Sequence, residues 1–160
     1  MGGVLQIVIP MSGFGERFRR AGYTVPKPLI EIDGKPIIAH VVDMFPGEHE
    51  FIFICNQDHL NTPEYRMEEI LRQYCPTGRI VGVAPHKLGP IHAVRQVEHM
   101  IDAQRPVIVN YCDFTCYWNW DHFKEFVAST QCAGALPAYK GFHPHTLGST
   151  NYAYMRETGG

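Results

Sequence analysis

A glycine-rich loop near the N-terminus carries the residue types best suited to chemistry in this chain of 160 residues. An apolar run over residues 4–9 leads into the sequence MSGFG at residues 11–15, as a buried strand that ends in a phosphate-binding loop would. The glycines allow positive φ angles and let main-chain N–H groups approach a bound anion. Two cations follow, Arg17 within the loop and Lys27 in a Pro-Lys-Pro segment. Main-chain donors combined with two cations predict a triphosphate site.

Three interpretations of this loop compete. The dinucleotide fingerprint G-x-G-x-x-G is excluded because Phe18 stands where its third glycine belongs. A P-loop is excluded because no Gly-Lys-Ser/Thr follows the glycines. A strand and turn that bind no ligand remain open, because a lone Gly-x-Gly is more often structural than functional.

The order of the motifs in residues 4–38 resembles the opening of the sugar-nucleotide pyrophosphorylases and related nucleotidyltransferases. The sequence GFGER at residues 13–17 is followed by PKPL at residues 26–29 and by GKPII at residues 34–38. That family opens with a strand, a Gly-x-Gly-Thr-Arg loop, a Pro-Lys pair and a Gly-Lys-Pro-hydrophobic helix start. The resemblance therefore extends over several motifs in the same order.

The first loop departs from the family pattern at two places, and the resemblance still assigns roles to its residues. Glu16 replaces the usual threonine, and residues 10–12 replace the usual run of small residues. The resemblance implies catalytic roles for Arg17 and Lys27. It implies nucleotide binding by Pro10, Met11, Ser12, Gly13, Gly15 and Glu16.

A second loop, with the sequence APHKLGPIHA at residues 84–93, lies where an expected strand meets an expected helix. In the family that this chain resembles, a glycine opens this helix and backbone groups lie against the base, which implies nucleotide-binding positions at Ala84 and Gly89. Family members often carry a base-reading glutamine where Ala84 stands, so the base stays open. An ordinary helix entry is the alternative. We expect His86 and His92 to be surface or supporting groups rather than catalysts.

Asp113 ends another expected strand, in the sequence VNYCDF at residues 109–114. A carboxylate at the tip of an apolar strand is costly to desolvate unless it is paired or holds a metal ion, and Mg²⁺ prefers carboxylate, phosphate and water oxygens. The position resembles the family's Gly-Asp, with Cys112 in place of the glycine, and implies a magnesium ligand. A solvated aspartate that caps the next segment is the alternative. Related enzymes also bring a glycine to the acceptor, which implies an acceptor-binding position at Gly148.

Together these pieces imply a magnesium-dependent nucleotidyltransferase that transfers a nucleoside monophosphate to a sugar phosphate and releases pyrophosphate, for capsule or other surface polysaccharide synthesis. Arg17 would hold the departing phosphates, and Lys27 would bridge the α-phosphate and the acceptor phosphate. Positioning and charge neutralisation carry most of such a reaction. One alternative is a cytidylyltransferase that acts on a non-sugar phosphate. Another is a catalytically inactive nucleotide-sensing domain.

The elements that position these motifs alternate between strands and helices along the chain. After the first strand we expect strands at residues 50–55, 79–84, 106–110, 133–138 and 151–156. We expect helices at residues 36–45, 62–74, 90–101 and 120–128. The alternation predicts a three-layer α/β/α sandwich with a mostly parallel sheet, Rossmann-like and, through the resemblance, GT-A-like. Ligands of such sheets bind beyond the carboxyl ends of the strands, where all the motifs above would meet.

Composition limits the class of protein further. A hydrophobic fraction of 45% and a charged fraction of 19% are ordinary for a globular domain, and the net charge of −2 disfavours nucleic acid as a partner. No run of about 20 apolar residues and no signal peptide is visible, so we expect a cytoplasmic protein without a membrane partner. The five cysteines form no C-x-x-C pair, which indicates reduced thiols and disfavours structural zinc.

The expected partners are a nucleoside triphosphate and a phosphorylated small molecule, and a homo-oligomer stays open. We expect residues 1–160 to be the nucleotide-binding part of one nucleotidyltransferase domain. Family members have more chain beyond this point, which completes the acceptor site and often supplies a second metal ligand.

Overall fold

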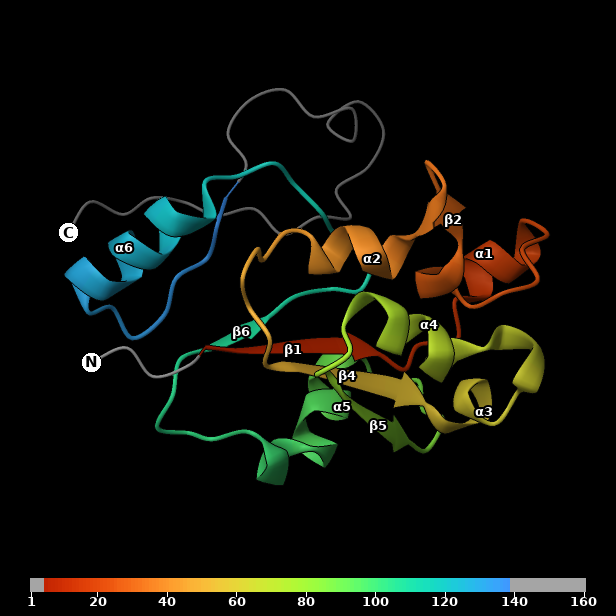
Figure 1. Cartoon of the computed structure of the whole chain (residues 1–160). Coiled ribbons are helices and arrows are strands. Elements are labelled where there is room, and N and C mark those ends of the chain that lie inside the picture. The colour runs from red at the N-terminus through yellow and green to blue at the C-terminus, as the bar shows by residue number, and fades with distance from the viewer. Residues whose placement is uncertain (1–4, 139–160) are drawn as a thin grey trace, which may run out of the picture. The chain divides into compact units, whose positions relative to one another are not determined.

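A four-stranded parallel sheet forms the centre of the computed structural model, which describes residues 5–138. The strand order is β5-β4-β1-β6 (Figure 1). Its strands are β1 (Gln6–Met11), β4 (Phe51–Asn56), β5 (Arg79–Val83) and β6 (Val107–Val109). A separate antiparallel pair is formed by β2 (Glu31–Ile32) and β3 (Lys35–Pro36). The sequence-based expectation of a mostly parallel sheet is confirmed.

Short helices make up much of the connections between the strands of the sheet. The α-helices are α1 (Glu16–Arg20), α2 (Ile37–Val42), α3 (Gln57–Leu60), α4 (Met67–Tyr74), α5 (Pro90–Gln96) and α6 (Trp120–Thr130). The 3₁₀ turns are η1 (Lys27–Leu29), η2 (Pro63–Tyr65) and η3 (Glu98–Met100). Among residues 5–138, no helix combines the length and the apolar character needed to cross a membrane.

The two central strands are buried along their whole length because helices cover both faces of the sheet. Every residue of β1 and of β4 is buried, as continuous apolar runs in parallel sheets predict. On one face, Val8 and Ile52 pack with Ala93 of α5. On the other face, the ring of Phe51 meets that of Phe45, which follows α2. Figure 1 shows α2 and α5 on opposite sides of the sheet, so the expected three-layer α/β/α arrangement is confirmed.

The strand order places a topological switch point at β1. The chain adds β4 and then β5 on one side of β1, and it returns to form β6 on the other side. Connections that leave neighbouring strands in opposite directions open a crevice at the carboxyl edge of a sheet, where ligands bind. The loops that follow β1 and β6 both begin at this edge.

Four of the expected elements differ from those observed. The helix expected at residues 62–74 is broken at Arg66, whose φ of 46° is left-handed, so η2 and α4 replace it. The helices expected at residues 36–45 and 90–101 are shorter, since α2 spans Ile37–Val42 and α5 ends at Gln96. The strand expected at residues 133–138 is wrong, because this segment is irregular. Its glycine weakens a strand and its proline lacks a ladder donor.

The strand expected at residues 151–156 lies outside the described residues. The chain divides into two compact units, Met1–Trp120 and Asp121–Gly160. The sheet and all the residues that line the pocket described below belong to the first unit. Most of α6 belongs to the second unit.

Gly78 stands in the turn between α4 and β5, where the chain has no room for a side chain. A Cβ added there would lie 2.6 Å from Cε2 of Phe53 and 3.1 Å from Sγ of Cys75, and the Phe53 ring is fully buried. Gly78→Ala is therefore expected to lower the free energy of unfolding by about 1–3 kcal/mol, as overpacking of a core does. Urea unfolding measures this change.

Gly13→Ala provides the matched control, because a Cβ at Gly13 has no atom within 4 Å. Its free energy of unfolding should stay within about 0.5 kcal/mol of wild type. Equal losses of unfolding free energy in the two variants would show that close packing against Phe53 is not what excludes a side chain at Gly78.

Candidate functional site

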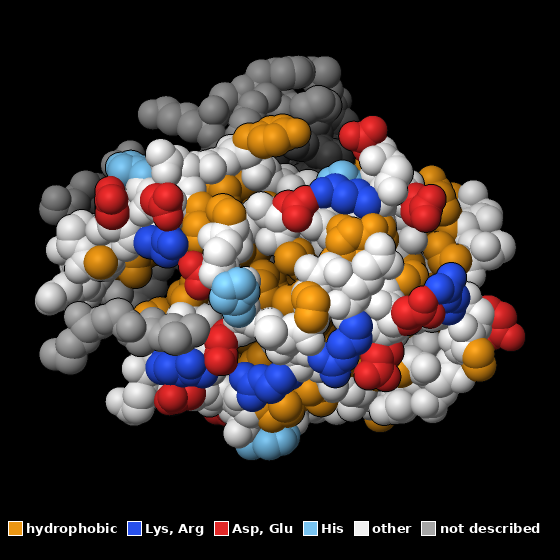
Figure 2. Space-filling model, in the orientation of Figure 1, with side chains coloured by type: hydrophobic (Ala, Val, Ile, Leu, Met, Phe, Trp, Pro, Cys, Tyr) orange, Lys and Arg blue, Asp and Glu red, His pale blue; other side chains and the backbone are white. Residues whose placement is uncertain are grey.

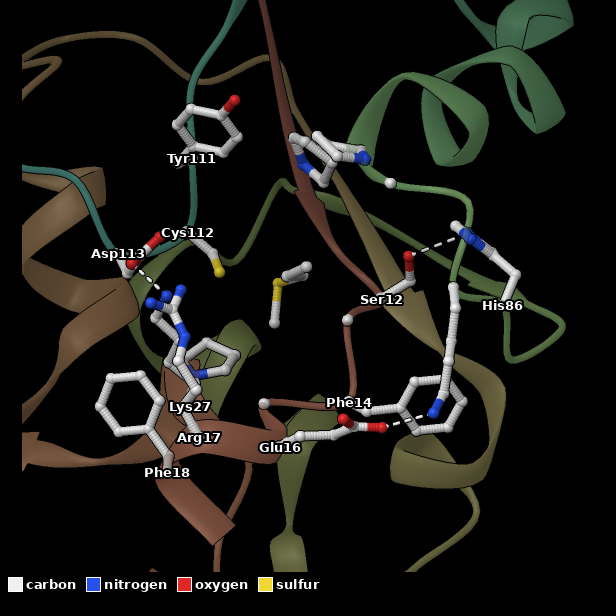
Figure 3. A pocket seen from close by; sticks show the side chains of 18 residues that line it. Ser12, Phe14, Glu16, Arg17, Phe18, Lys27, His86, Tyr111, Cys112 and Asp113 are labelled. Carbon is white, nitrogen blue, oxygen red and sulfur yellow. Dashed lines mark hydrogen bonds and ion pairs between the residues drawn. The ribbon is translucent and has the colours of Figure 1, made fainter. Parts of the chain in front are cut away.

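A pocket of about 500 Å³ lies at the carboxyl edge of the sheet (Figure 3). Four segments line it: residues 10–18 from the end of β1 into α1, residues 27–28 of η1, the loop residues 86–87 and 89–90, and residues 111–113 after β6. These segments are far apart in the sequence, and the parallel sheet brings them together. The pocket is therefore at the switch point that the topology defines.

The first loop bends sharply at Gly15. Its φ of 61° is left-handed, and its carbonyl accepts from two N–H groups of α1, that of Phe18 at 2.9 Å and that of Arg19 at 3.1 Å. A Cβ at Gly15 would lie 3.7 Å from Cβ of Lys27, so the loop runs close over η1. A side chain here would be strained by the backbone conformation. Glycine thus places the loop and Lys27 on the same wall of the pocket.

The ammonium group of Lys27 lies between a carboxylate and an aromatic ring. It forms an ion pair with Asp113, and both side chains are only partly exposed, at 23% and 34%. The ammonium also lies 5.1 Å from the centre of the Phe18 ring, which is within cation–π range. Two residues therefore fix the cation at the pocket wall.

Arg17 is an exposed cation that lines the same pocket. Within residues 5–138 it has no ion-pair partner, in contrast to Lys27. Figure 3 shows Arg17, Lys27 and Asp113 on one side of the pocket, opposite Ser12 and His86. The pocket thus offers one cation without a carboxylate partner and one cation that a carboxylate holds.

Ser12 and His86 join the first loop to the second loop. The Leu88 N–H donates to Nδ1 of His86 at 3.3 Å, so the ring proton belongs on Nε2, which lies 3.3 Å from Oγ of Ser12. The Ser12 hydroxyl then accepts from His86 and keeps its own hydrogen for another acceptor. The side chain of Asn56, at the end of β4, donates to the Ser12 carbonyl at 3.3 Å. Ser12 is therefore held from two sides.

A second connection between the loops is an ion pair. Nζ of Lys87 lies 2.5 Å from Oε1 of Glu16 and 5.7 Å from the centre of the Phe14 ring. The hydrogen bond from Lys87 lowers the pKa of the Glu16 carboxyl below its ordinary value. Both side chains are exposed, so the pair contributes little to stability. It does place a third cation at the pocket.

The thiol of Cys112 is not a candidate nucleophile. Burial raises its pKa to about 12, so that it is protonated at neutral pH. A neutral thiol neither attacks an electrophile nor binds a metal ion well. All five cysteines are free in the structure.

The structure brings most of the expected site residues together. Of those that sequence analysis assigns to nucleotide, catalysis or metal, ten line the pocket: Pro10, Met11, Ser12, Gly13, Gly15, Glu16, Arg17, Lys27, Gly89 and Asp113. Ala84 does not; it is exposed, and the lining residues of its loop begin at His86. Gly148 lies outside the described residues.

Several lining residues had no pocket assignment in the sequence analysis, which expected His86 only as a surface or supporting group. His86 and Lys87 reach the pocket from the second loop, and Phe14, Phe18 and Tyr111 supply aromatic rings to its lining. The signal for His86 and Lys87 was their place just before Gly89 in a loop already assigned to the nucleotide. The aromatic residues carried no such signal.

Asp113 is the pocket's candidate ligand for a divalent cation. Among residues 5–138, no three His, Cys, Asp or Glu side chains form a cluster that could hold a metal ion by themselves. Mg²⁺ needs no such cluster, because it binds through one or two carboxylates together with phosphate oxygens and water. A partly exposed carboxylate beside a glycine-rich loop fits this pattern.

The fold and the pocket define a class of protein that comparison with known sequences makes explicit. The sequence matches the MobA-like NTP transferase domain family over residues 7–158, and the chain belongs to this family. The mannose-1-phosphate guanylyltransferase catalytic subunit beta of Danio rerio is 26% identical over 155 residues. The glucose-1-phosphate cytidylyltransferase of Salmonella typhimurium is 35% identical over 63 residues.

Solved structures share the fold. A UDP-glucose pyrophosphorylase from Acinetobacter baumannii superposes with a TM-score of 0.60 at 19% identity, over 81% of this chain and 54% of the other. A nucleoside-diphosphate-sugar pyrophosphorylase from Vibrio cholerae gives a TM-score of 0.51 at 24% identity, over 68% and 47%.

The chain spans only part of the curated relatives. The matches cover 92% of this chain and 41% of the guanylyltransferase, and 38% of this chain and 24% of the cytidylyltransferase. The similarity thus shows the family and the fold of this chain.

Proposed function

We propose that this chain carries the nucleoside triphosphate site of a magnesium-dependent nucleotidyltransferase that acts on a sugar phosphate. The observation that carries the proposal is the meeting of Arg17, Lys27 and Asp113 with a glycine loop in one pocket. The named relatives support the reaction class, because they are a guanylyltransferase and a cytidylyltransferase of sugar 1-phosphates. Each of these relatives matches this chain over only part of its own length.

The triphosphate would lie along the first loop. Main-chain N–H groups around Gly13 and Gly15 are suited to phosphate oxygens, and Arg17 would hold the β- and γ-phosphates. The base would extend toward the second loop, and the hydroxyl of Ser12 in the first loop, oriented by His86 of the second loop, can donate to it. Asp113 would hold the magnesium ion, whose positive charge would offset the negative charge of the phosphates during the reaction.

The transfer exchanges one phosphorus–oxygen bond for another. An oxygen of the acceptor phosphate forms a bond to the α-phosphorus, and the bond from the α-phosphorus to the bridging oxygen breaks as pyrophosphate leaves. Lys27 would lie between the two phosphates and reduce their mutual repulsion. No protein base is needed, because a phosphate monoester is largely ionised at pH 7.

Turnover with a panel of substrates tests this proposal. The protein is incubated with magnesium, each common nucleoside triphosphate, and either sugar 1-phosphates or non-sugar phosphate monoesters. Pyrophosphate release is followed by a coupled assay and the product by mass spectrometry. We expect release with a sugar phosphate and one preferred triphosphate.

Other results would select the alternatives. Release only with non-sugar phosphates would contradict a sugar acceptor and favour a cytidylyltransferase of another class. Tight triphosphate binding without release from any acceptor would favour a nucleotide-sensing domain.

The wider setting follows from the substrates. A nucleotide-activated sugar is a donor for polysaccharide assembly, and we place the protein in the cytoplasm because that is where its proposed substrates occur. Nucleic acid is not proposed as a partner, since the net charge is −2. On the face seen in Figure 2, acidic and basic side chains are interspersed rather than separated by sign.

Phe18 is expected to help position Lys27 in this reaction. Phe18→Leu removes the ring beneath the ammonium and should lower turnover by about threefold, in line with the size of a partly exposed cation–π contact. Phe18→Tyr keeps the ring face and should retain wild-type turnover. Loss of activity in both variants alike would show that Phe18 acts through packing rather than through Lys27.

A further inference from the structure

The ion pair between Lys27 and Asp113 joins two groups that the proposed function needs for different partners. Lys27 is assigned to phosphate oxygens and Asp113 to a divalent cation, yet in the structure each is bound to the other. An ammonium and a divalent cation at the same carboxylate repel each other, so a metal ion on Asp113 disfavours its contact with Lys27. Binding of the metal ion is therefore expected to weaken this pair.

The charged residues of the pocket determine how a polyphosphate without a metal ion would interact with it. The charged lining residues are Glu16, Arg17, Lys27, Lys87 and Asp113. Lys87 is paired with Glu16 and Lys27 with Asp113, so two of the three cations are engaged by carboxylates. A polyphosphate that arrives without a metal ion has no cation to offer Asp113 in exchange for Lys27.

The surroundings of Lys27 allow it to stay in place once the carboxylate releases it. Its backbone is fixed in η1, which the buried Pro28 and Leu29 anchor. Its ammonium lies over the Phe18 ring as well as beside Asp113. The ring therefore keeps the cation at the pocket wall, within the same pocket as Arg17.

We propose that Asp113 exchanges its cation when the ligand binds: it holds Lys27 in the free protein and releases it to bind the divalent cation that accompanies a triphosphate. Lys27 then contributes to phosphate binding only when the metal ion is present. This inference rests on the proposed function, and it adds that metal dependence comes from the release of Lys27 as well as from the metal's own charge.

A comparison that keeps the charge of the pocket constant tests the exchange. Lys27→Met with Asp113→Asn removes both members of the pair at once, without changing the net charge. The probe is inorganic triphosphate, which carries the phosphates of any nucleotide and avoids the question of the base. Calorimetry measures its affinity in magnesium and in EDTA at equal ionic strength, because charge effects depend on salt.

The expected results differ between the two buffers. In EDTA, wild type and the double variant should bind triphosphate with similar affinity, because Lys27 is engaged in wild type and missing in the variant. In magnesium, the double variant should bind at least about tenfold more weakly than wild type, because it lacks both the released Lys27 and the metal ligand Asp113. Asp113→Asn alone should bind about tenfold more tightly than the double variant in EDTA, since it frees Lys27.

Glu16→Gln is the matched control for the single variant. It also removes one negative charge from the pocket and frees Lys87, but it leaves Asp113 unchanged. Its affinity should rise in both buffers by the same factor, so that the ratio between magnesium and EDTA stays that of wild type. In Asp113→Asn this ratio should fall toward one. Thermal unfolding confirms that each variant is folded.

Two outcomes separate failure of the exchange from failure of the proposed function. If the double variant loses as much affinity in EDTA as in magnesium, Lys27 binds phosphate regardless of the metal and the exchange is wrong, while the triphosphate site stands. If wild type binds triphosphate in neither buffer, the proposed function is wrong, and the proposed exchange is then wrong as well.

Discussion

Lys27→Ala is expected to lower turnover by ~10²-fold or more, which is the usual effect of removing one group that stabilises a transition state. The reason is electrostatic. Lys27 is the cation proposed to lie between the α-phosphate and the acceptor phosphate, two anions that must approach each other. Initial rates of pyrophosphate release at saturating magnesium measure the effect.

The fold should tolerate this change. The pair with Asp113 is partly exposed, and such pairs contribute about 1 kcal/mol or less to stability. Lys35→Ala is the matched control, because Lys35 is also a partly exposed lysine paired with an aspartate, Asp43, but does not line the pocket. It should keep wild-type turnover. An unchanged rate in Lys27→Ala would remove Lys27 from the mechanism.

Arg17→Gln is expected to lower kcat/KM for the triphosphate by ~10²-fold, because the pocket loses the cation assigned to the departing phosphates. Arg17 has no ion-pair partner among the described residues, so its replacement leaves no carboxylate without its cation. The loss should be present with every acceptor, since the departing pyrophosphate is the same. Steady-state kinetics with varied triphosphate measure it.

Arg95→Gln serves as the control for Arg17→Gln. Arg95 is exposed on α5 and does not line the pocket, so its removal changes the net charge by the same amount at a different place. If both variants lose activity equally, the effect comes from the net charge of the protein, and Arg17 has no specific role in the pocket. If Arg17→Gln alone is impaired, the pocket assignment is supported.

The central strands could be predicted from the sequence because their signal is local. Continuous apolar runs mark β1 and β4, and both lie within one or two residues of the expected positions. The break at Arg66 had no such signal, because a non-glycine residue with a left-handed φ depends on its surroundings. The apolar residues at 133–138 favoured a strand in the sequence analysis despite the glycine and proline in this segment. The structure shows an irregular segment there.

The composition of the pocket could be predicted in large part, and its internal contacts could not. The glycine loop, Arg17 and Asp113 each belong to a motif that follows a strand, and Lys27 belongs to the Pro-Lys-Pro segment that comes after α1. Whether two such side chains pair depends on distances across the assembled sheet. Ser12 and His86 are 74 residues apart and Glu16 and Lys87 are 71 apart, so spacing in the sequence carries no information about these contacts.

A crystal structure of the protein with magnesium and its preferred triphosphate is the most direct test of the site. We expect the phosphates along residues 13–17, Arg17 and Lys27 within hydrogen-bond distance of phosphate oxygens, and Asp113 bound to the metal ion instead of to Lys27. A triphosphate bound elsewhere, or bound in this pocket with the metal ion remote from Asp113, would contradict the account.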